Sequence, residues 1–556
     1  MAGSHIHSTH LILLSLAGSL VIPVGVAARA QTALDRVQPP SVRDEPTPSE
    51  EPNAEKPVRI ESPPQLRSNA PRQAVRAGAI VLQGLRTLAP ADFADIVGTR
   101  VAQTLSPQEL SELADAIAGR ARDRGLVFAS AWIGKQQLRN GVLTVQVDEG
   151  RIDEIRFDGP DQPAVRAALA PLADGNPVRI DALERRLLIA GDIDGVRIQS
   201  SRFLREGNKG VLLVKLAVDR VAGRATLANE GTRPIGREQL TLQVDLSGVL
   251  AHDDSLAVTW SSTPAEPSEL QFGRVRYEKR INTSGTELAL MASGSQARPG
   301  AYLEPFDIRS RSWYVTATIL QPLSRRRDAS LWLEGELGMR NLNQWRRGIQ
   351  VREDRVVAAR ATLYGNTGVA GGRLGASTTM SRGLGILGAT RAGDPLASRW
   401  DADGTFTTLS GWADWSGNLG GAMTLRLAMM AQLSTDPLLI GEEMGLGGTG
   451  FLRGYDWFER SGDQGVAGLV ELRYALDRPL GLARRAQLYT FADGGKVTNK
   501  DSGFGSGSLA SAGGGIRADV TGSFGANLEV AVPLSGARYD INDESPKVNF
   551  RLVKTF

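Results

Sequence analysis

An arginine near the tip of a long, glycine-rich connection is the strongest candidate for a functional residue in this sequence. Arg453 lies within the connection 434–465, directly before Gly454. Glycine allows a backbone to fold closely against a wall. An arginine drawn into a partly dehydrated space needs a carboxylate, and its planar guanidinium can pair with both oxygens of one partner. Asp493 is the predicted partner, and Glu471 is the second candidate.

Both candidate carboxylates lie on one face of segments that read as strands. Glu471 and Arg473 share a parity that is opposite to that of Val470, and Asp493 shares its parity with Phe491. Successive side chains of a strand point to opposite faces, so the polar set points inward if Val470 points outward. We therefore predict an ion pair that holds the connection inside the fold. The alternative is a solvated charge on a surface loop.

Covalent chemistry has few candidates in this sequence. There is no cysteine, and three of the four histidines lie in the first ten residues, which leaves His252 for any Ser–His–Asp relay. Two G-x-G-x-x-G matches, Gly383–Gly388 and Gly445–Gly450, do not lie between a strand and a helix, as a dinucleotide site requires. We expect no enzyme activity, no metal and no cofactor. The net charge of +3 also gives no reason to expect nucleic acid as a partner.

The first 77 residues look like an export signal and a linker. A short apolar stretch ends in Ala28-Arg29-Ala30, which predicts removal of residues 1–30 and a mature chain that starts at Gln31. Residues 31–77 contain nine of the 27 prolines and predict an extended linker. No later apolar run is long enough for a membrane-spanning helix.

Two copies of one α+β pattern follow, in residues 78–150 and 151–220. Each reads strand–helix–helix–strand–strand, with Gly84 and Gly159 at the same place in the pattern. In the first copy we expect strand 80–85, helix 90–97, a helix opening at the capping box Ser106–Glu109, and strands 128–133 and 142–147 joined by a turn at Asn140-Gly141. In the second we expect strand 152–157, helix 164–172, a capped helix opening at Asp181, and strands 195–203 and 211–218.

Residues 221–556 change to alternating segments of about ten residues separated by turn residues. In one segment Leu528 and Val530 oppose Glu529, and about sixteen such segments can be counted. A soluble β-sandwich or propeller also alternates. The export signal, the charged opposite face and the terminal Phe556 favour a transmembrane β-barrel of about sixteen antiparallel strands, wide enough to leave a polar lumen.

Three segments resemble a known family of outer-membrane proteins. The residues that carry the resemblance are Gly125, Gln137, Gly141, Leu143, Val147, Glu149 and Gly150, then Leu452-Arg453-Gly454-Tyr455, then Phe491-Ala492-Asp493-Gly494-Gly495. In this order they are similar to the two-partner secretion transporters of the haemolysin-activator and filamentous-haemagglutinin-exporter type, within the outer-membrane assembly superfamily. The resemblance covers nearly the whole chain after residue 78.

The resemblance implies a secretion pore in the outer membrane of a Gram-negative bacterium. Two polypeptide-transport-associated (POTRA) modules in the periplasm would receive an unfolded exoprotein, and the barrel would pass it outward. It implies a loop motif of Leu452, Arg453, Gly454 and Tyr455, with Asp493, Glu471, Phe491 and Gly495 as wall partners. The expected partners are a large β-helical exoprotein and outer-membrane lipid, and the expected pore is a monomer. A plug helix after the signal would be very short or missing, because Pro39-Pro40 follows Val37.

The second module is the predicted receptor for the exoprotein. We expect extended client segments to pair with an edge of its sheet, beside the helix that carries Arg185 and Arg186. Two other functions remain open from the residues. A barrel-assembly or translocation-assembly factor would normally have more modules, and a plain porin would explain neither the modules nor the Leu452–Tyr455 segment.

Overall fold

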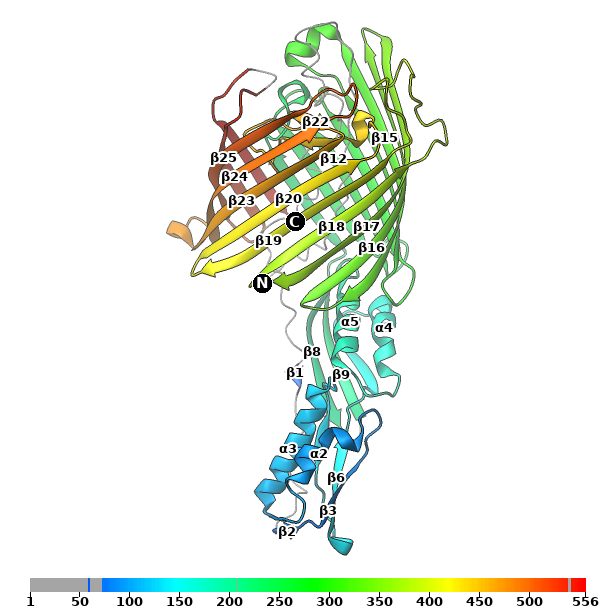
Figure 1. Cartoon of the computed structure of the whole chain (residues 1–556), viewed down its shortest axis with the longest axis vertical. Helices are drawn as coiled ribbons and strands as arrows, with labels where there is room; N and C mark the ends of the chain where they lie inside the picture. The colour runs from blue at the N-terminus through cyan, green and yellow to red at the C-terminus, as the bar shows by residue number, and fades with distance from the viewer. Residues whose placement is uncertain (1–58, 61–72, 208, 539–541) are drawn as a thin grey trace. The chain divides into compact units, whose positions relative to one another are not determined.

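The computed structural model describes residues 59–60, 73–207, 209–538 and 542–556 (Figure 1). Its two compact units meet in the sequence between Asp219 and Arg220. The predicted signal segment 1–30 and the start of the mature chain lie outside the described residues, as does most of the predicted linker. Among the described residues, no helix is both long and apolar enough to cross a membrane.

The first module is a three-stranded sheet, β3-β6-β5, packed against one long helix. Its elements are β2 (Val75–Arg76), β3 (Ala79–Gln83), η4 (Pro90–Phe93), α2 (Ala94–Gly98), β4 (Thr104–Leu105), α3 (Pro107–Asp123), β5 (Ser130–Trp132), η5 (Arg139–Gly141) and β6 (Val142–Asp148). The capping box forms as predicted: the Ser106 N–H donates to Glu109 at 2.8 Å, and the Glu109 N–H donates to the Ser106 hydroxyl at 3.3 Å. The predicted helix 90–97 is instead a 3-10 turn followed by a short α-helix, because Phe93 leaves the helical region.

The second module forms a four-stranded sheet in the order β1-β8-β9-β7. Its elements are β1 (Arg59–Ile60), β7 (Glu154–Asp158), α4 (Pro163–Leu169), η6 (Ala170–Ala173), α5 (Ile180–Gly191), β8 (Val196–Glu206) and β9 (Lys209–Val218). Two expectations were wrong. Helix α5 begins at Ile180 after Arg179, which makes no side-chain cap, so Asp181 lies in the first turn. Residues 59–60 of the predicted linker form a strand parallel to β8.

The paired glycines explain why the pattern repeats. Gly84 and Gly159 both have positive φ, 102° and 131°. A Cβ on Gly84 would lie 2.2 Å from the Val147 carbonyl oxygen, and one on Gly159 would lie 2.4 Å from that of Leu216. Each module therefore needs a glycine directly after β3 or β7, where the chain passes close to the backbone of the paired strand, β6 or β9.

The junction between the two modules is built on one aromatic side chain. Phe128 follows helix α3 of the first module, yet it is buried in the hydrophobic core of the second. Its ring stacks on that of Phe203, with centroids 3.9 Å apart. The Ile180 N–H also donates to the Gly125 carbonyl at 2.9 Å.

The turn expected at Asn140-Gly141 is longer than a two-residue hairpin, because β5 ends at Trp132.

The second unit is a closed antiparallel barrel of sixteen strands, which confirms the predicted fold class. The strands are β10 (Val221–Ala228), β11 (Gln239–Ser247), β12 (Asp254–Ser262), β13 (Gln271–Arg280), β14 (Glu287–Ala297), β15 (Ile308–Arg325), β16 (Ala329–Arg346), β17 (Ile349–Val369), β18 (Gly372–Gly383), β19 (Thr407–Gly420), β20 (Met423–Ser434), β23 (Gln464–Asp477), β24 (Arg485–Thr498), β25 (Gly507–Asp519), β26 (Phe524–Pro533) and β27 (Lys547–Thr555). Strand β10 closes the barrel against β27, with Thr226 opposite Val553.

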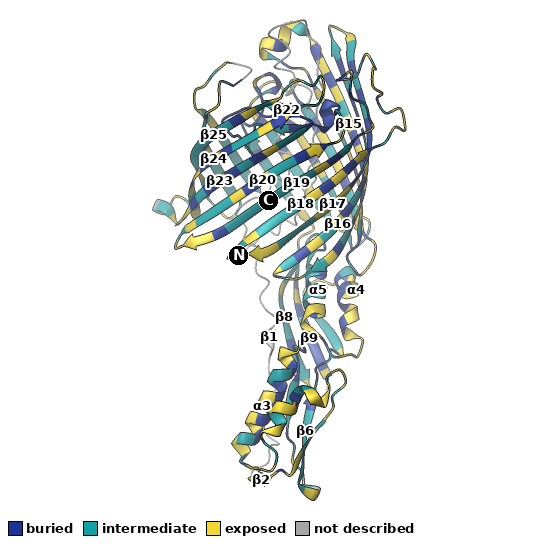
Figure 2. Cartoon of the chain, in the orientation of Figure 1, coloured by how far each residue is buried: buried dark blue, intermediate teal, exposed yellow. Residues whose placement is uncertain are grey.

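Burial alternates along the barrel strands, as Figure 2 shows. On β26, Leu528 and Val530 are 51% and 43% exposed, whereas Glu529 between them is 4% exposed. On β23, Glu471 is fully buried and Val470 is 52% exposed. The charged parity therefore faces the interior, where water or a partner can accept charge, and the apolar parity faces outward.

Candidate functional site

The connection between β20 and β23 places its tip against the inner face of the barrel. We call residues 434–465 the inward loop. It contains η9 (Ile440–Glu442), β21 (Met444–Leu446) and β22 (Arg460–Gly462), and β21 pairs with β22 into a short ribbon. The tip follows the ribbon's first strand, and its Leu452 and Tyr455 are fully buried.

Arg453 lies between two carboxylates that come from different strands of the wall. Its Nη2 is 2.6 Å from Oε2 of Glu471 on β23, and its Nη1 is 2.9 Å from Oε2 of Glu529 on β26. The guanidinium carbon also lies 4.1 Å from the ring centroid of Phe491 on β24. Arg453 is 3% exposed. We call Arg453, Glu471, Glu529 and Phe491 the tip site.

Arg453 and Asp493 form the predicted ion pair only at long range, and the guanidinium does not make the predicted fork with Asp493. Arg453 Nε is 4.0 Å from Asp493 Oδ2, and the Arg453 backbone N–H donates to that oxygen at 3.3 Å. The other oxygen of Asp493 accepts the hydroxyl of Ser511. Asp493 therefore binds the loop backbone, while Glu471, the second candidate, binds the side chain.

Sequence reasoning missed Glu529 as a partner of Arg453. Its inward parity was visible, but many residues have that parity. Glu529 also accepts the Tyr489 hydroxyl at 3.0 Å and the Asn549 side-chain amide at 3.2 Å. Only the path of the loop across β24 and β25 brings Arg453 to this carboxylate.

Charges balance around the tip. Glu471 accepts Arg473 Nε at 2.6 Å and Arg517 Nη1 at 2.8 Å, in addition to Arg453. The three arginines thus face three carboxylates, those of Glu471, Glu529 and Asp493. A buried charge is costly unless it is paired, so each member depends on its neighbours.

The other tip residues fit the wall by shape and hydrogen bonding. Leu452 packs in a cluster with Leu446 and Val497. A Cβ on Gly454 would lie 2.8 Å from the backbone nitrogen of Pro533, so only glycine allows this approach. The Tyr455 hydroxyl lies 3.0 Å from that of Ser535.

Gly495 on β24 makes room for the ribbon of the loop. A Cβ there would lie 2.9 Å from a methyl of Leu446 and 3.0 Å from the Cβ of Ala467. The structure thus brings the predicted motif Leu452–Tyr455 into contact with Glu471, Phe491, Asp493 and Gly495. In the part of the chain that the structure describes, no cluster of three or more His, Asp or Glu is placed to hold a metal.

The predicted client-binding residues lie elsewhere. Arg185 and Arg186 are adjacent and half-buried on α5. Burial and the neighbouring charge of Arg185 lower the pKa of Arg186. Without β1, strand β8 would be the edge of the sheet, but Arg202 and Phe203 on β8 pair with β1, which takes the edge position there. The edge expected to receive the client is therefore partly occupied.

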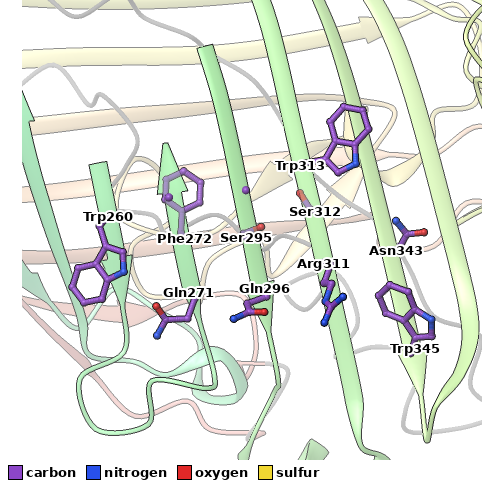
Figure 3. A pocket seen from close by; sticks show the side chains of 12 residues that line it. Trp260, Gln271, Phe272, Ser295, Gln296, Arg311, Ser312, Trp313, Asn343 and Trp345 are labelled. Carbon is purple, nitrogen blue, oxygen red and sulfur yellow. The ribbon is translucent and has the colours of Figure 1, made fainter. Parts of the chain in front are cut away.

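A shallow depression of about 620 Å³ lies on the outer face of the barrel (Figure 3). Its side chains include Trp260, Trp313 and Trp345, with Arg311 beside Trp345. Trp260 and Trp313 are 42% and 39% exposed. Tryptophans gather at the interfaces of membrane proteins, so we assign this depression to the surface that faces lipid and not to the tip site.

Comparisons with known proteins agree with this architecture. Residues 208–518, more than half of the chain, match the family described as haemolysin secretion/activation protein ShlB/FhaC/HecB, and residues 76–150 match the ShlB-type POTRA domain. The chain is 25% identical to the outer membrane transporter CdiB of Escherichia coli over 504 residues, 86% of this chain and 82% of that protein. It is 22% identical over 491 residues to the heme/hemopexin transporter protein HuxB of Haemophilus influenzae, covering 84% of each.

The solved structure of CdiB from Escherichia coli has the same fold. It matches with a TM-score of 0.70 at 20% sequence identity, over 94% of this chain and 95% of that one. The modules therefore lie in the periplasm and the barrel in the outer membrane. The chain belongs to the haemolysin secretion/activation family and is a two-partner secretion transporter of the outer membrane.

Proposed function

We propose that the inward loop closes the lumen at rest and that release of the tip site opens the path for an unfolded exoprotein. The observation that supports this most is the position of Arg453 between Glu471 and Glu529, at 2.6 and 2.9 Å. No covalent step is needed for such a function, so we infer a transporter without enzyme activity. We further infer a monomeric pore, in contact with outer-membrane lipid, whose partner is a large β-helical exoprotein.

The test is replacement of Arg453 by alanine. Glu471 and Glu529 would then lose a buried cation, and the loop would lose its charged contact with the wall. The loop would then leave its closed position without the exoprotein, so we expect the resting pore to leak small ions and regulated secretion to fall by at least about tenfold, while the barrel remains in the membrane. The matched control is Arg426→Ala, which removes an inward arginine whose partner is Asp414 on the adjacent strand, 2.6 Å away. Normal secretion by Arg453→Ala would refute the role of the tip.

We also propose that the chain divides functionally into modules 78–150 and 151–220 and barrel 221–556, and that the second module captures the client. Arg185 and Arg186 support this, since they lie on the helix beside β8 and could attract acidic client segments. Deletion of the module would expose Phe128, which is part of its core. A double charge reversal, Arg185→Glu with Arg186→Glu, is the cleaner test.

We expect this double variant to weaken client binding measured with the purified transporter, and to secrete less. Arg166→Glu is the matched control, because Arg166 is an exposed arginine of the same module that pairs with Asp161 on its surface. If the unchanged transporter, the double variant and Arg166→Glu bind the client equally well, Arg185 and Arg186 are not part of the receptor.

A further inference from the structure

A second buried carboxylate joins the inward loop to the wall, near the start of the loop. Glu442 ends η9 and is 4% exposed. Arg360 on β17 donates from Nη2 to both of its oxygens, at 2.9 and 2.8 Å. Arg340 on β16 places Nη1 3.5 Å from the same carboxylate and donates to the Gly441 carbonyl at 3.3 Å.

The two arginines are held in place by the wall itself. Glu336 on β16 lies 3.4 Å from Arg360 Nη1 and accepts the Tyr314 hydroxyl at 2.7 Å. The guanidinium of Arg340 lies 4.4 Å from the centre of the Tyr314 ring. The group therefore contains two cations, Arg340 and Arg360, and two carboxylates, one from the wall and one from the loop. Without Glu442 it would hold one excess buried positive charge.

This group is separate from the tip site. Strands β18, β19 and β20 lie between β17 and β23 in the barrel order. The contacts described for Glu442 involve β16 and β17, and those of Arg453 involve β23 to β26. Ion pairs thus tie the loop to two sectors of the wall: β16 and β17 through Glu442, and β23 to β27 around the tip, where Asp456 also pairs with Lys547 on β27 at 2.6 Å. Glu443 and Asp463 of the loop pair in addition with Arg399, in the connection between β18 and β19.

We propose that Glu442, held by Arg340 and Arg360, is a base clamp: a positioning element that keeps the inward loop closed independently of the tip site. This inference rests on the proposed role of the loop as the closing element of the lumen. The clamp acts through ion pairs in a polar lumen, where water or client charges can replace the partners as the loop moves. Opening the pore then requires release at both sectors, because either attachment alone keeps part of the loop against the wall.

The experiment measures how often the loop leaves the wall in the full-length transporter. The chain has no cysteine, so Thr449→Cys, between the two attachments, provides the only thiol. A membrane-impermeant maleimide is added to intact cells, and the labelling rate is compared in four backgrounds: unchanged, Glu442→Gln, Arg453→Ala, and both changes together. Heat-modifiable migration on gels shows which barrels are folded.

We expect Glu442→Gln to raise the labelling rate by about tenfold, because it leaves two buried arginines with one carboxylate. Two independent attachments have additive free energies, so the double variant should show roughly the product of the two single increases. Asp414→Asn is the matched control, since Asp414 pairs with Arg426 between two wall strands, and it should leave the rate unchanged. Glu442→Asp keeps the charge but shortens the side chain, so it should give a smaller increase in a barrel that folds normally.

Two results would overturn the base clamp. One is a labelling rate that neither Glu442→Gln nor Glu442→Asp changes, while Arg453→Ala raises it. The other is a double variant that is labelled no faster than Arg453→Ala alone, which would make Glu442 dependent on the tip. If Arg453→Ala also has no effect, the closing role of the loop itself fails, and the two failures are thereby distinguished.

Discussion

The junction between the two periplasmic modules and the tip site of the inward loop are both buried contacts, but the junction is apolar and the tip site is charged. The junction is an aromatic stack, Phe128 on Phe203, with backbone hydrogen bonds around it. The tip site is an arginine between two carboxylates. Both join segments that are separate in the sequence.

An apolar contact and a charged contact differ in how easily they separate and form again. Separating the junction would expose a large apolar side chain to water, which costs about 3 kcal/mol or more with nothing to replace the contact. A buried ion pair contributes little net free energy compared with an apolar pair of the same shape, because its attraction is offset by desolvation. Charged contacts can therefore exchange partners in a wet lumen, whereas the junction should stay closed during transport.

The largest effect is expected from neutralising the shared carboxylate of the tip. Glu471→Gln leaves Arg453, Arg473 and Arg517 without their common anion. Loss of one member of a buried ion network costs about 3–5 kcal/mol, so we expect a clear fall in the urea midpoint of the folded barrel in liposomes. A shift no larger than that of Asp414→Asn would contradict the comparison.

Removing the aromatic ring at the junction should lower stability nearly as much, and it should do so in both modules. Phe128→Ala should cost about 3 kcal/mol, because the ring fills the core of the second module. Hydrogen exchange of the full-length protein should then increase in residues 73–150 and in 151–218. Leu113→Ala is the control, since Leu113 belongs to the first core alone and should affect only the first module. If Phe128→Ala increases hydrogen exchange in the first module alone, Phe128 does not stabilise the second module.

A smaller, pH-dependent effect is expected at Glu149, in the resemblance segment beside the junction. Burial would raise the pKa of this carboxyl, but N–H donation from Leu88 and donation from Thr87 outweigh it and lower the pKa. Glu149→Gln should cost about 1–3 kcal/mol at neutral pH. Because the pKa is lowered in the folded state, the stabilisation is complete above the ordinary value of 4.5 and is lost as pH falls through the lowered pKa.

The measurement is thermal unfolding of the periplasmic modules within the full-length protein at several pH values. The difference in unfolding temperature between the unchanged protein and Glu149→Gln should be constant near pH 7 and become smaller in acid. Glu112→Gln, which changes an exposed glutamate of helix α3, should show no such convergence. A difference that grows as the pH falls would reverse the sign and refute this account.

The smallest effect is expected at Asp493, which binds the loop backbone and not the guanidinium fork. Asp493→Asn keeps an oxygen that can accept the Arg453 N–H, so we expect a loss of about 1 kcal/mol in barrel stability and near-normal secretion. The exchange Arg453→Asp with Asp493→Arg should not restore secretion, because Glu471 and Glu529 would then face a third carboxylate. Rescue by that exchange would show that Arg453 and Asp493 are the functional pair after all.

Features that depend on neighbours along the chain could be predicted from the order of the amino acids alone. The capping box at Ser106 and Glu109, the strand parity of Glu471 and the repeated glycines Gly84 and Gly159 are all present as predicted. Their physical reason is local: the donors at a helix start, the twofold period of a strand and the steric limit at positive φ act within a few residues. Sixteen alternating segments, together with the export signal, the charged opposite face and the terminal Phe556, were therefore enough to predict the barrel and its polar interior.

Which inward-facing charges pair with one another depends on the three-dimensional fold. Strand parity placed Glu471, Asp493 and Glu529 on the same face of the barrel wall. Which of these carboxylates pairs with Arg453 depends on where the loop crosses the strands. That position follows from the register of β23 to β26 and from the room at Gly454 and Gly495. The same holds for Glu442 with Arg340 and Arg360, and for Phe128 in the core of its neighbouring module. Such contacts join residues far apart in the chain, and no local period in a sequence specifies them.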